Sequence, residues 1–172
     1  MPKRDYASEL SIDELRQILS CDFETGALTW LVNRRKVKPG DRAKRRTPLG
    51  YYRVGYKGRD YLAHRVVWAL YNGAWPPPDM DIDHIDGDPA NNAINNLRVC
   101  HHGENMRNRG KQANNKTGFK GVRVHPLSPK FNARIQHKGV GVHLGMFDTA
   151  EEAHEAYCKA ARELHGNFAK VA

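Results

Sequence analysis

Apolar and polar residues follow helical and strand spacings in the first half of the chain. Ser11, which can cap a helix, precedes an apolar stripe at helical spacing, and Glu14 stands three positions after it. This pattern predicts a short capped helix. Alternating residues at 50–56 and 61–63 flank a turn-forming stretch and predict a β-hairpin. A second helix is expected at about 64–72, where apolar residues line one face and a glycine follows.

The centre of the chain predicts two strands and a helix. Residues 82–87 alternate like a strand that ends in a tight turn, 97–100 suit a returning strand, and 101–109 suit a short helix. A helix that crosses such a hairpin brings the end of the first strand close to one helix face. Asp83 and Asn105 can then both offer oxygen atoms to a single cation.

The last third of the chain predicts a small sheet and one long helix. Three short strands are expected at about 120–125, 132–137 and 142–147, and a helix from the capping box at 149–152 to about His165. Small residues on the inner face of this helix permit close packing on a sheet. The expected class is therefore α+β, with a ββα motif and a three-stranded antiparallel sheet packed on one helix.

These elements group into four parts along the sequence. We expect an N-terminal helix and hairpin segment at 1–63, a core at 64–110, a linker at 111–116 and a further domain at 117–172. Within the first part, the basic stretch 34–46 has no apolar periodicity and predicts a mobile loop. Such a loop is either simply solvated or a phosphate-contacting arm.

The net charge of the chain indicates the class of partner that it binds. The 172 residues carry a formal charge of +9, with a pI near 9.6, which favours a polyanion such as nucleic acid. Residues 1–63 hold 14 Lys/Arg against 8 Asp/Glu, whereas residues 64–116 hold six of each. The neutral centre, which contains the candidate acid and base residues, is thus flanked by positive segments. A phosphate-binding protein with an embedded cation site has this distribution.

The remaining composition indicates an intracellular protein. The three cysteines are odd in number and far apart, which favours neither a disulfide framework nor a cysteine-rich zinc site. No apolar run approaches the roughly 18 residues of a membrane span, so no membrane partner is expected. The first residues lack the apolar segment of a secretory signal. The predicted location is the cytoplasm, that of the host cell if the gene is phage-encoded.

The central residues have the chemistry of a metal-dependent phosphodiesterase. Oxygen ligands such as Asp83 and Asn105 favour one hard ion, Mg²⁺ or Mn²⁺, which can neutralise charge on a scissile phosphate. His84 points to the opposite side of the strand and suits a general base acting on water. Asn96 can fix which ring nitrogen faces that water. This chemistry needs the side chains at 83, 84 and 105 to share one pocket that is open to solvent.

The same residue types also form turns, which is the structural alternative. Asp-Gly and Asn-Asn pairs are common turn formers, and we assign Asp86-Gly87 and Asn91-Asn92 to that role. Turn formation does not explain Asp83-His84 inside an apolar strand, with two further asparagines downstream.

These residues resemble the HNH nuclease superfamily, the ββα-metal fold, in the form found in phage and intron-homing endonucleases. The matching stretches are His64-Arg65-Val66-Val67-Trp68, Ile82-Asp83-His84-Ile85-Asp86-Gly87 and Asn95-Asn96-Leu97-Arg98. The resemblance implies that His84 is the general base, that Asp83 and Asn105 bind the metal, and that Asn96 orients the histidine. Asn105 stands where many members have a second histidine ligand. An asparagine there also occurs among the homing enzymes, and it argues against zinc.

Polar side chains on the C-terminal sheet form a candidate DNA-reading face. Its residues are Arg123, Arg134, Gln136 and Lys138. Arginine and glutamine on strands can pair with guanine and adenine edges in a major groove, although a small sheet also has an ordinary polar outer face. Residues 117–168 resemble the DNA-binding domain of plant ethylene-response factors (the APETALA type). Phe131 departs from the tryptophan that is usual there.

Together these features predict a metal-dependent endonuclease of the phage or homing type that nicks or cuts double-stranded DNA at a preferred sequence, as a monomer or homodimer. The candidate phosphate contacts are Arg107, Arg109, Lys111 and Lys116. The rival hypothesis is a sequence-specific DNA-binding regulator with an inactive HNH motif, and a third is an RNA-directed nuclease.

Overall fold

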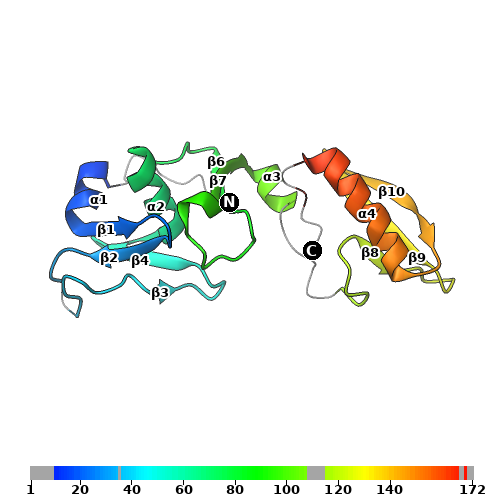
Figure 1. Cartoon of the computed structure of the whole chain (residues 1–172), viewed down its shortest axis with the longest axis horizontal. Helices are drawn as coiled ribbons and strands as arrows, with labels where there is room; N and C mark the ends of the chain where they lie inside the picture. Colours follow the sequence, from blue (N-terminus) through cyan, green and yellow to red (C-terminus); the bar gives the residue numbers. More distant parts are fainter. Residues whose placement is uncertain (1–9, 35, 108–114, 167–168, 170–172) are drawn as a thin grey trace. The chain divides into compact units, whose positions relative to one another are not determined.

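A computed structural model describes residues 10–34, 36–107, 115–166 and 169 of the chain. The chain divides into two compact units, Met1–His102 and Gly103–Ala172. Both contain helices, and every strand pair within them is antiparallel (Figure 1). The α+β class expected from the sequence is confirmed. In the part of the chain that is described, no helix combines the length and apolar character needed to cross a membrane.

The N-terminal unit opens with α1 (Ile12–Ile18), which is capped as predicted. The Ser11 hydroxyl accepts a hydrogen bond from the Glu14 N–H at 3.1 Å. An antiparallel hairpin of β1 (Leu19–Asp22) and β2 (Ala27–Trp30) follows.

A second sheet has the order β3 (Arg45–Arg46), β4 (Tyr52–Tyr56) and β5 (Arg59–Leu62). The predicted hairpin is β4–β5, and its turn is tighter than expected because Lys57 and Gly58 both take positive φ. Helix α2 (Ala63–Asn72) starts where β5 ends and stops at Gly73, which is left-handed. Both α1 and α2 lie on one side of these strands (Figure 1).

One hydrophobic core joins these elements to the central motif. It combines the inner faces of α1 and α2 with side chains of β2, β4, β6 and β7, so the described N-terminal elements and the central hairpin share one core. Its members include Leu15, Ile18, Leu19, Trp30, Val54, Val66, Val67, Leu70, Ile82 and Leu97.

The basic stretch 34–46 differs from the mobile loop expected. Its second half returns to β2, where the Trp30 N–H donates to the Asp41 carbonyl at 2.9 Å and the Ala43 N–H donates to the Leu28 carbonyl at 2.9 Å. Arg45 and Arg46 then pair with β4 as β3. Backbone hydrogen bonds hold this segment in place. Such bonds need no periodic pattern of apolar side chains, so the sequence pattern did not reveal them.

The central motif is a hairpin of β6 (Met80–His84) and β7 (Leu97–His101). A 3₁₀ turn, η2 (Ile94–Asn96), precedes β7, and helix α3 (His102–Arg107) follows it. The predicted strand, returning strand and short helix are thus all present.

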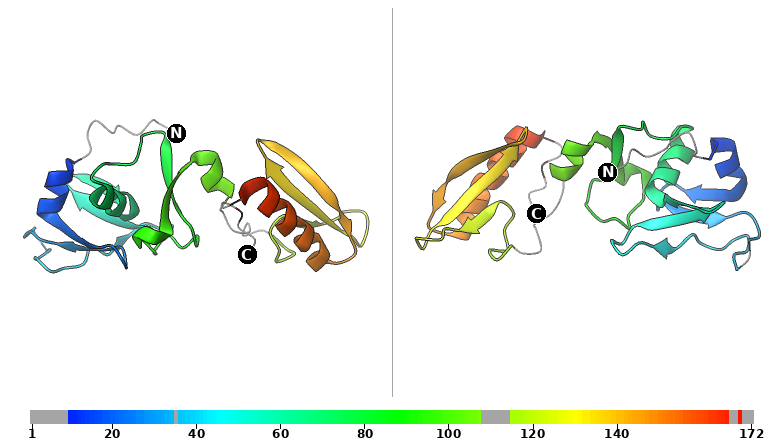
Figure 2. Two further views of the ribbon diagram at one scale, coloured as in Figure 1. Left: turned by 45° about the horizontal axis from the view of Figure 1, so that its top comes forward. Right: turned by 180° about the vertical axis from the view of Figure 1, so that it is seen from behind.

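The C-terminal unit contains a sheet of order β10–β9–β8 and one helix. Its elements are β8 (Val122–Val124), β9 (Phe131–His137), β10 (Val140–Phe147) and α4 (Ala150–His165). The predicted capping box is formed by Thr149 and Glu152. Helix α4 lies across one face of the sheet (Figure 2). Tyr157 of this helix lies against Gly121, the residue before β8. Burial raises the pKa of Tyr157 to about 12.

Candidate functional site

Asp83 and His84 end β6 and point to opposite faces of the hairpin, as strand alternation requires. Asp83 is 4% exposed and His84 is 5% exposed. The expectation of a pocket open to solvent is therefore wrong for these two residues in the free chain. The reason is local: amide, aromatic and guanidinium groups of neighbouring elements pack around both side chains.

The His84 ring is held by Asn92, a residue that sequence reasoning assigned only to a turn. Nε2 of His84 lies 3.0 Å from Oδ1 of Asn92, and Asn92 is 2% exposed. An amide oxygen can only accept, so Nε2 carries the hydrogen and Nδ1 carries the basic lone pair. This contact thus selects the tautomer that has its lone pair on Nδ1.

Two more rings pack against His84. The His64 ring meets it edge-on with centroids 5.0 Å apart, and the Tyr51 ring lies 5.9 Å from it. His64 comes from the first turn of α2, and Tyr51 immediately precedes β4. These contacts restrict rotation of the imidazole. His64 stands in one of the stretches that resemble HNH nucleases, but residue spacing did not predict its contact with His84.

Asn96 contacts the turn that follows His84, and its predicted role in orienting the histidine stays a prediction. Its Oδ1 accepts from the Asp86 N–H at 3.1 Å, and its Nδ2 donates to the Asp86 carboxylate at 3.0 Å and to the Asn91 carbonyl at 2.8 Å. Burial works to raise the pKa of Asp86, but hydrogen bonds from Asp88, Asn91 and Asn96, with the nearby His84, lower it overall. Asn96 therefore holds the turn after His84, and Asn92 holds the ring.

Asp83, the predicted metal ligand, is paired with Arg98 across the hairpin. Nε and Nη2 of Arg98 donate to one oxygen, Oδ2, at 2.8 and 2.7 Å. The two side chains are 5% and 18% exposed. Strand register explains the pair, because Asp83 and Arg98 are direct cross-strand partners. A cation at Asp83 would share the carboxylate with this guanidinium.

The loop that carries Asn92 is supported by the β1–β2 turn. The Ile94 N–H donates to the Phe23 carbonyl at 3.0 Å. Gly26 has a φ of +68°, and a Cβ built on it would lie 2.1 Å from the Asn92 carbonyl carbon. Only glycine allows the turn and the loop to approach this closely. An element far from the motif in sequence thus fixes the residue that holds the His84 ring.

The chemistry of the donor set fits a hard cation, since it consists of a carboxylate and an amide. Among the side chains that the structure describes, no three His, Cys, Asp or Glu residues gather to hold a metal ion. Asn105 is half-buried in α3 and belongs to the C-terminal unit, whereas Asp83 belongs to the N-terminal one. The shared metal site of Asp83 and Asn105 stays a prediction.

The predicted phosphate contacts fall mostly beyond the described residues. Arg109 and Lys111 lie outside them, as does the side chain of Arg107 at the end of α3. Lys116 is described and exposed. Its role also stays a prediction.

The face of the C-terminal sheet opposite α4 carries the predicted polar residues. Arg123, Arg134 and Gln136 are exposed, and they alternate with Val122, Ala133 and Ile135, which are buried against the helix. Figure 2 shows this face with none of the described helices upon it. Lys138 is exposed in the β9–β10 turn, where its φ is +48°. It is therefore a turn residue beside the face.

Two features of this face were not foreseen. His143 and Asn132 are hydrogen-bonded at 3.0 Å on β10 and β9. The Arg134 guanidinium lies directly over Gly141, because a Cβ there would be 2.2 Å from Nη2 of Arg134. Gly141 thus gives the Arg134 side chain a flat surface on which to lie.

Residues 61–107 match the HNH endonuclease family. The chain is 34% identical to Protein 3.8 of Escherichia phage T7 over 107 residues, which cover 62% of this chain and 87% of that protein. It is 30% identical to an uncharacterized HNH endonuclease of Acanthamoeba polyphaga mimivirus over 118 residues, or 69% of this chain and 60% of the viral protein.

A shorter part of the chain matches a plant protein. The chain is 49% identical to an ethylene-responsive transcription factor of Arabidopsis thaliana over 66 residues, which cover 37% of this chain and 25% of that factor. No solved structure matches the chain significantly. Since the family match spans β5 to α3 and the phage relative is covered over most of its length, the chain belongs to the HNH endonuclease family.

Proposed function

We propose that the protein is a metal-dependent endonuclease that hydrolyses phosphodiester bonds of double-stranded DNA, with β6, β7 and α3 as its ββα-metal motif. The observation that carries the proposal is the contact of Asn92 with His84 inside the matched HNH region. It holds the imidazole in the tautomer whose Nδ1 lone pair can take a proton.

In this mechanism His84 takes the proton from the attacking water at Nδ1, while Nε2 stays hydrogen-bonded to Asn92. Tyr51 and His64 keep the ring aligned. The candidate ligands Asp83 and Asn105 would hold one Mg²⁺ or Mn²⁺, which supplies neutralisation of charge on the phosphate and the leaving oxygen. Positioning and charge neutralisation carry most of such a reaction.

The burial of Asp83 and His84 adds a requirement to this mechanism. Arg98 occupies Oδ2 of Asp83 in the free chain, and its guanidinium is a permanent cation. We expect Arg98 to release this oxygen when DNA and the divalent ion arrive, because the phosphate offers the guanidinium a new anionic partner.

The C-terminal unit is proposed to read the DNA sequence. Support comes from the partial match to the plant transcription factor and from the free sheet face with Arg123, Arg134 and Gln136. Strand arginines and glutamines have the hydrogen-bond geometry for guanine and adenine edges. An APETALA-type reader joined to a nuclease would favour cleavage near a preferred sequence, as in a phage or homing enzyme.

The test is cleavage of supercoiled plasmid DNA with Mg²⁺ or Mn²⁺. We expect His84→Ala to lower the rate about 100-fold or more, since it removes the general base, while DNA binding persists. His101→Ala is the matched control, because His101 is an exposed histidine of the same hairpin. Circular dichroism checks that both variants fold. Equal rates for both variants would refute the role of His84.

Two other outcomes would replace the proposed function. Specific binding without cleavage under any divalent ion would make the protein a DNA-binding regulator with an inactive motif. Faster cleavage of RNA than of duplex DNA would make it an RNA-directed nuclease. Sequencing of the cleaved ends would show whether one strand or both are cut.

A further inference from the structure

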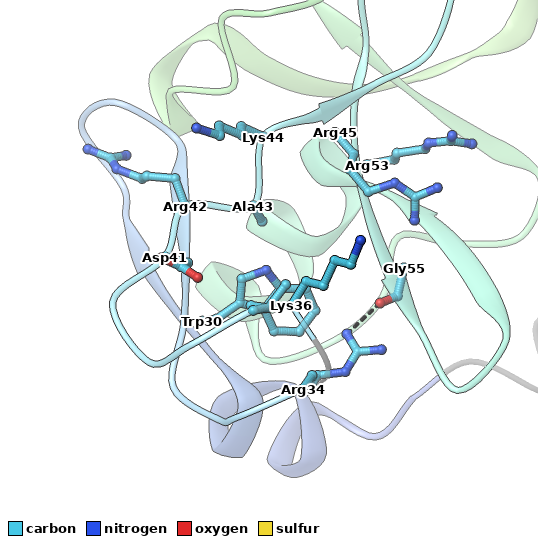
Figure 3. Close-up of a pocket in the computed structure, with 11 residues that line it drawn as sticks. Trp30, Arg34, Lys36, Asp41, Arg42, Ala43, Lys44, Arg45, Arg53 and Gly55 are labelled. Carbon is cyan, nitrogen blue, oxygen red and sulfur yellow. Dashed lines mark hydrogen bonds between the residues drawn. The ribbon is translucent and has the colours of Figure 1, made fainter.

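A basic pocket lies in the N-terminal unit, outside the matched HNH region. It encloses about 870 Å³ between the returning segment 40–46 and strand β4 (Figure 3). Six cationic residues line it, against one carboxylate, that of Asp41. They are Arg34, Lys36, Arg42, Lys44, Arg45 and Arg53.

Arg34 is fixed at the base of this pocket. Its guanidinium carbon lies 4.7 Å from the Trp30 ring centre and 4.8 Å from that of Tyr56, and Nη1 donates to the Gly55 carbonyl at 2.6 Å. Aromatic faces and a backbone acceptor thus hold the guanidinium in one orientation. A cation that is ordered before binding loses less entropy when an anion arrives.

The carboxylates near the pocket are already engaged. Asp41 accepts a hydrogen bond from the Lys38 N–H at 2.7 Å. Asp60 pairs with Arg53 at 2.7 Å and reaches Arg45 at 3.7 Å. These contacts fix the loop and two arginines, and they leave the pocket with a positive excess.

The lining favours a polymer backbone over a free nucleotide. Trp30 is only 5% exposed, so its ring serves as packing and offers no face on which a base could stack. The cations are spread over a loop, a returning segment and a strand, and Lys36, Lys44 and Arg45 are exposed. Such an array suits consecutive phosphates and needs no base contact.

We propose that this pocket binds the phosphate backbone of duplex DNA at a position separate from the hairpin that contains His84. The inference rests on the proposed function, because DNA is the expected substrate. It assigns a role to the N-terminal basic segment, which anchors the strand while the central hairpin acts on it.

The test compares two double variants that remove the same charges. Lys36→Gln with Arg45→Gln alters the pocket, whereas Lys38→Gln with Arg46→Gln alters exposed neighbours that do not line it. Arg45 and Arg46 are adjacent in β3, so they point to opposite faces. Duplex binding by the full chain is measured by fluorescence anisotropy over a range of NaCl, with EDTA so that no cleavage occurs.

For the pocket variant, we expect the plot of log affinity against log salt to be less steep by about 1.8, since each lost phosphate contact removes about 0.9. The factor by which the pocket variant binds more weakly than the unaltered chain should then fall roughly twelve-fold as salt rises from about 50 to about 200 mM. The control variant should keep the original slope. Equal slope changes in both variants, or none in the pocket variant, would overturn the proposal.

Competition decides between sources of phosphate. Inorganic phosphate and a deoxynucleoside monophosphate should fail to displace duplex DNA at micromolar concentration. Displacement by either, or tighter binding of duplex RNA that depends on the pocket residues, would also overturn the proposal. Because binding is measured without divalent ions, a chain that fails to cleave can still pass this test, and an active nuclease can still fail it.

Discussion

At the scale of single residues, the side chains around His84 differ in the atoms that they contact. Asn92 and Asn96 are both buried asparagines near His84, but Asn92 accepts a hydrogen bond from the ring, whereas Asn96 secures the Asp86 turn. The resemblance implied that Asn96 orients the histidine. That role stays a prediction; in the observed contacts, Asn92 holds the ring and Asn96 holds the backbone turn that follows it.

This division predicts different effects of removing amides. Asn92→Ala removes the acceptor for Nε2 of His84, so we expect the single-turnover cleavage rate to fall about tenfold or more, in line with losses of groups that orient a ligating or basic histidine. Asn95→Ala removes an exposed amide of η2 as the control. The dissociation constant for DNA, measured without divalent ion, should stay within about twofold for both. A fall in affinity that accounts for the whole loss of rate would contradict the positioning role of Asn92.

At the scale of elements, local patterns predicted most of the structure. The capped helix α1, the β4–β5 hairpin, α2 with its terminal glycine and the capping box of α4 all depend on residues within a few positions of one another. The return of residues 40–43 to β2 and the pairing of Arg98 with Asp83 were missed. These depend on backbone pairing and strand register, which residue spacing does not encode.

The contact between the β1–β2 turn and the Asn92 loop predicts a long-range effect. Gly26 and Gly58 both have positive φ, but a Cβ at Gly58 meets no atom within 4 Å, whereas one at Gly26 meets the Asn92 backbone. Gly58→Ala should therefore cost only the left-handed strain, about 1 kcal/mol of unfolding free energy. Gly26→Ala should cost about 3 kcal/mol or more, because backbone must move. We also expect it to slow cleavage, because Asn92 is displaced.

Urea unfolding and plasmid cleavage measure both effects. The control separates conformational strain from steric overlap, since both substitutions impose the same backbone penalty. Equal stability losses in the two variants would show that the turn and the loop do not depend on their close approach.

At the scale of the whole molecule, we propose different tasks for different parts of the chain. The cleavage motif lies in a stretch with balanced charge, the basic pocket lies before it, and the candidate reading face lies in the C-terminal unit. Composition predicted a nucleic-acid partner, but it did not show where anions would bind. The pocket arises only when the returning segment and β4 come together.

The final prediction separates sequence reading from charge. A preferred site is first selected from a random DNA pool with the unaltered chain. Arg134→Ala should then lower the ratio of preferred to random binding about tenfold or more, since one good base contact contributes about 1–3 kcal/mol of discrimination. Arg162→Ala removes the same charge from an exposed position on α4, and we expect it to leave that ratio unchanged.

Gly141→Ala tests the same role of Arg134 without removing any charge. The three atoms nearest to the new Cβ all belong to the flexible end of Arg134, so this side chain should shift while the sheet stays folded. We expect preferred-site binding to weaken and random-site binding to remain, since total charge sets the latter. If Gly141→Ala binds preferred sites like the unaltered chain while Arg134→Ala weakens all sites equally, then Arg134 acts as a phosphate contact and the sheet face does not read bases through it.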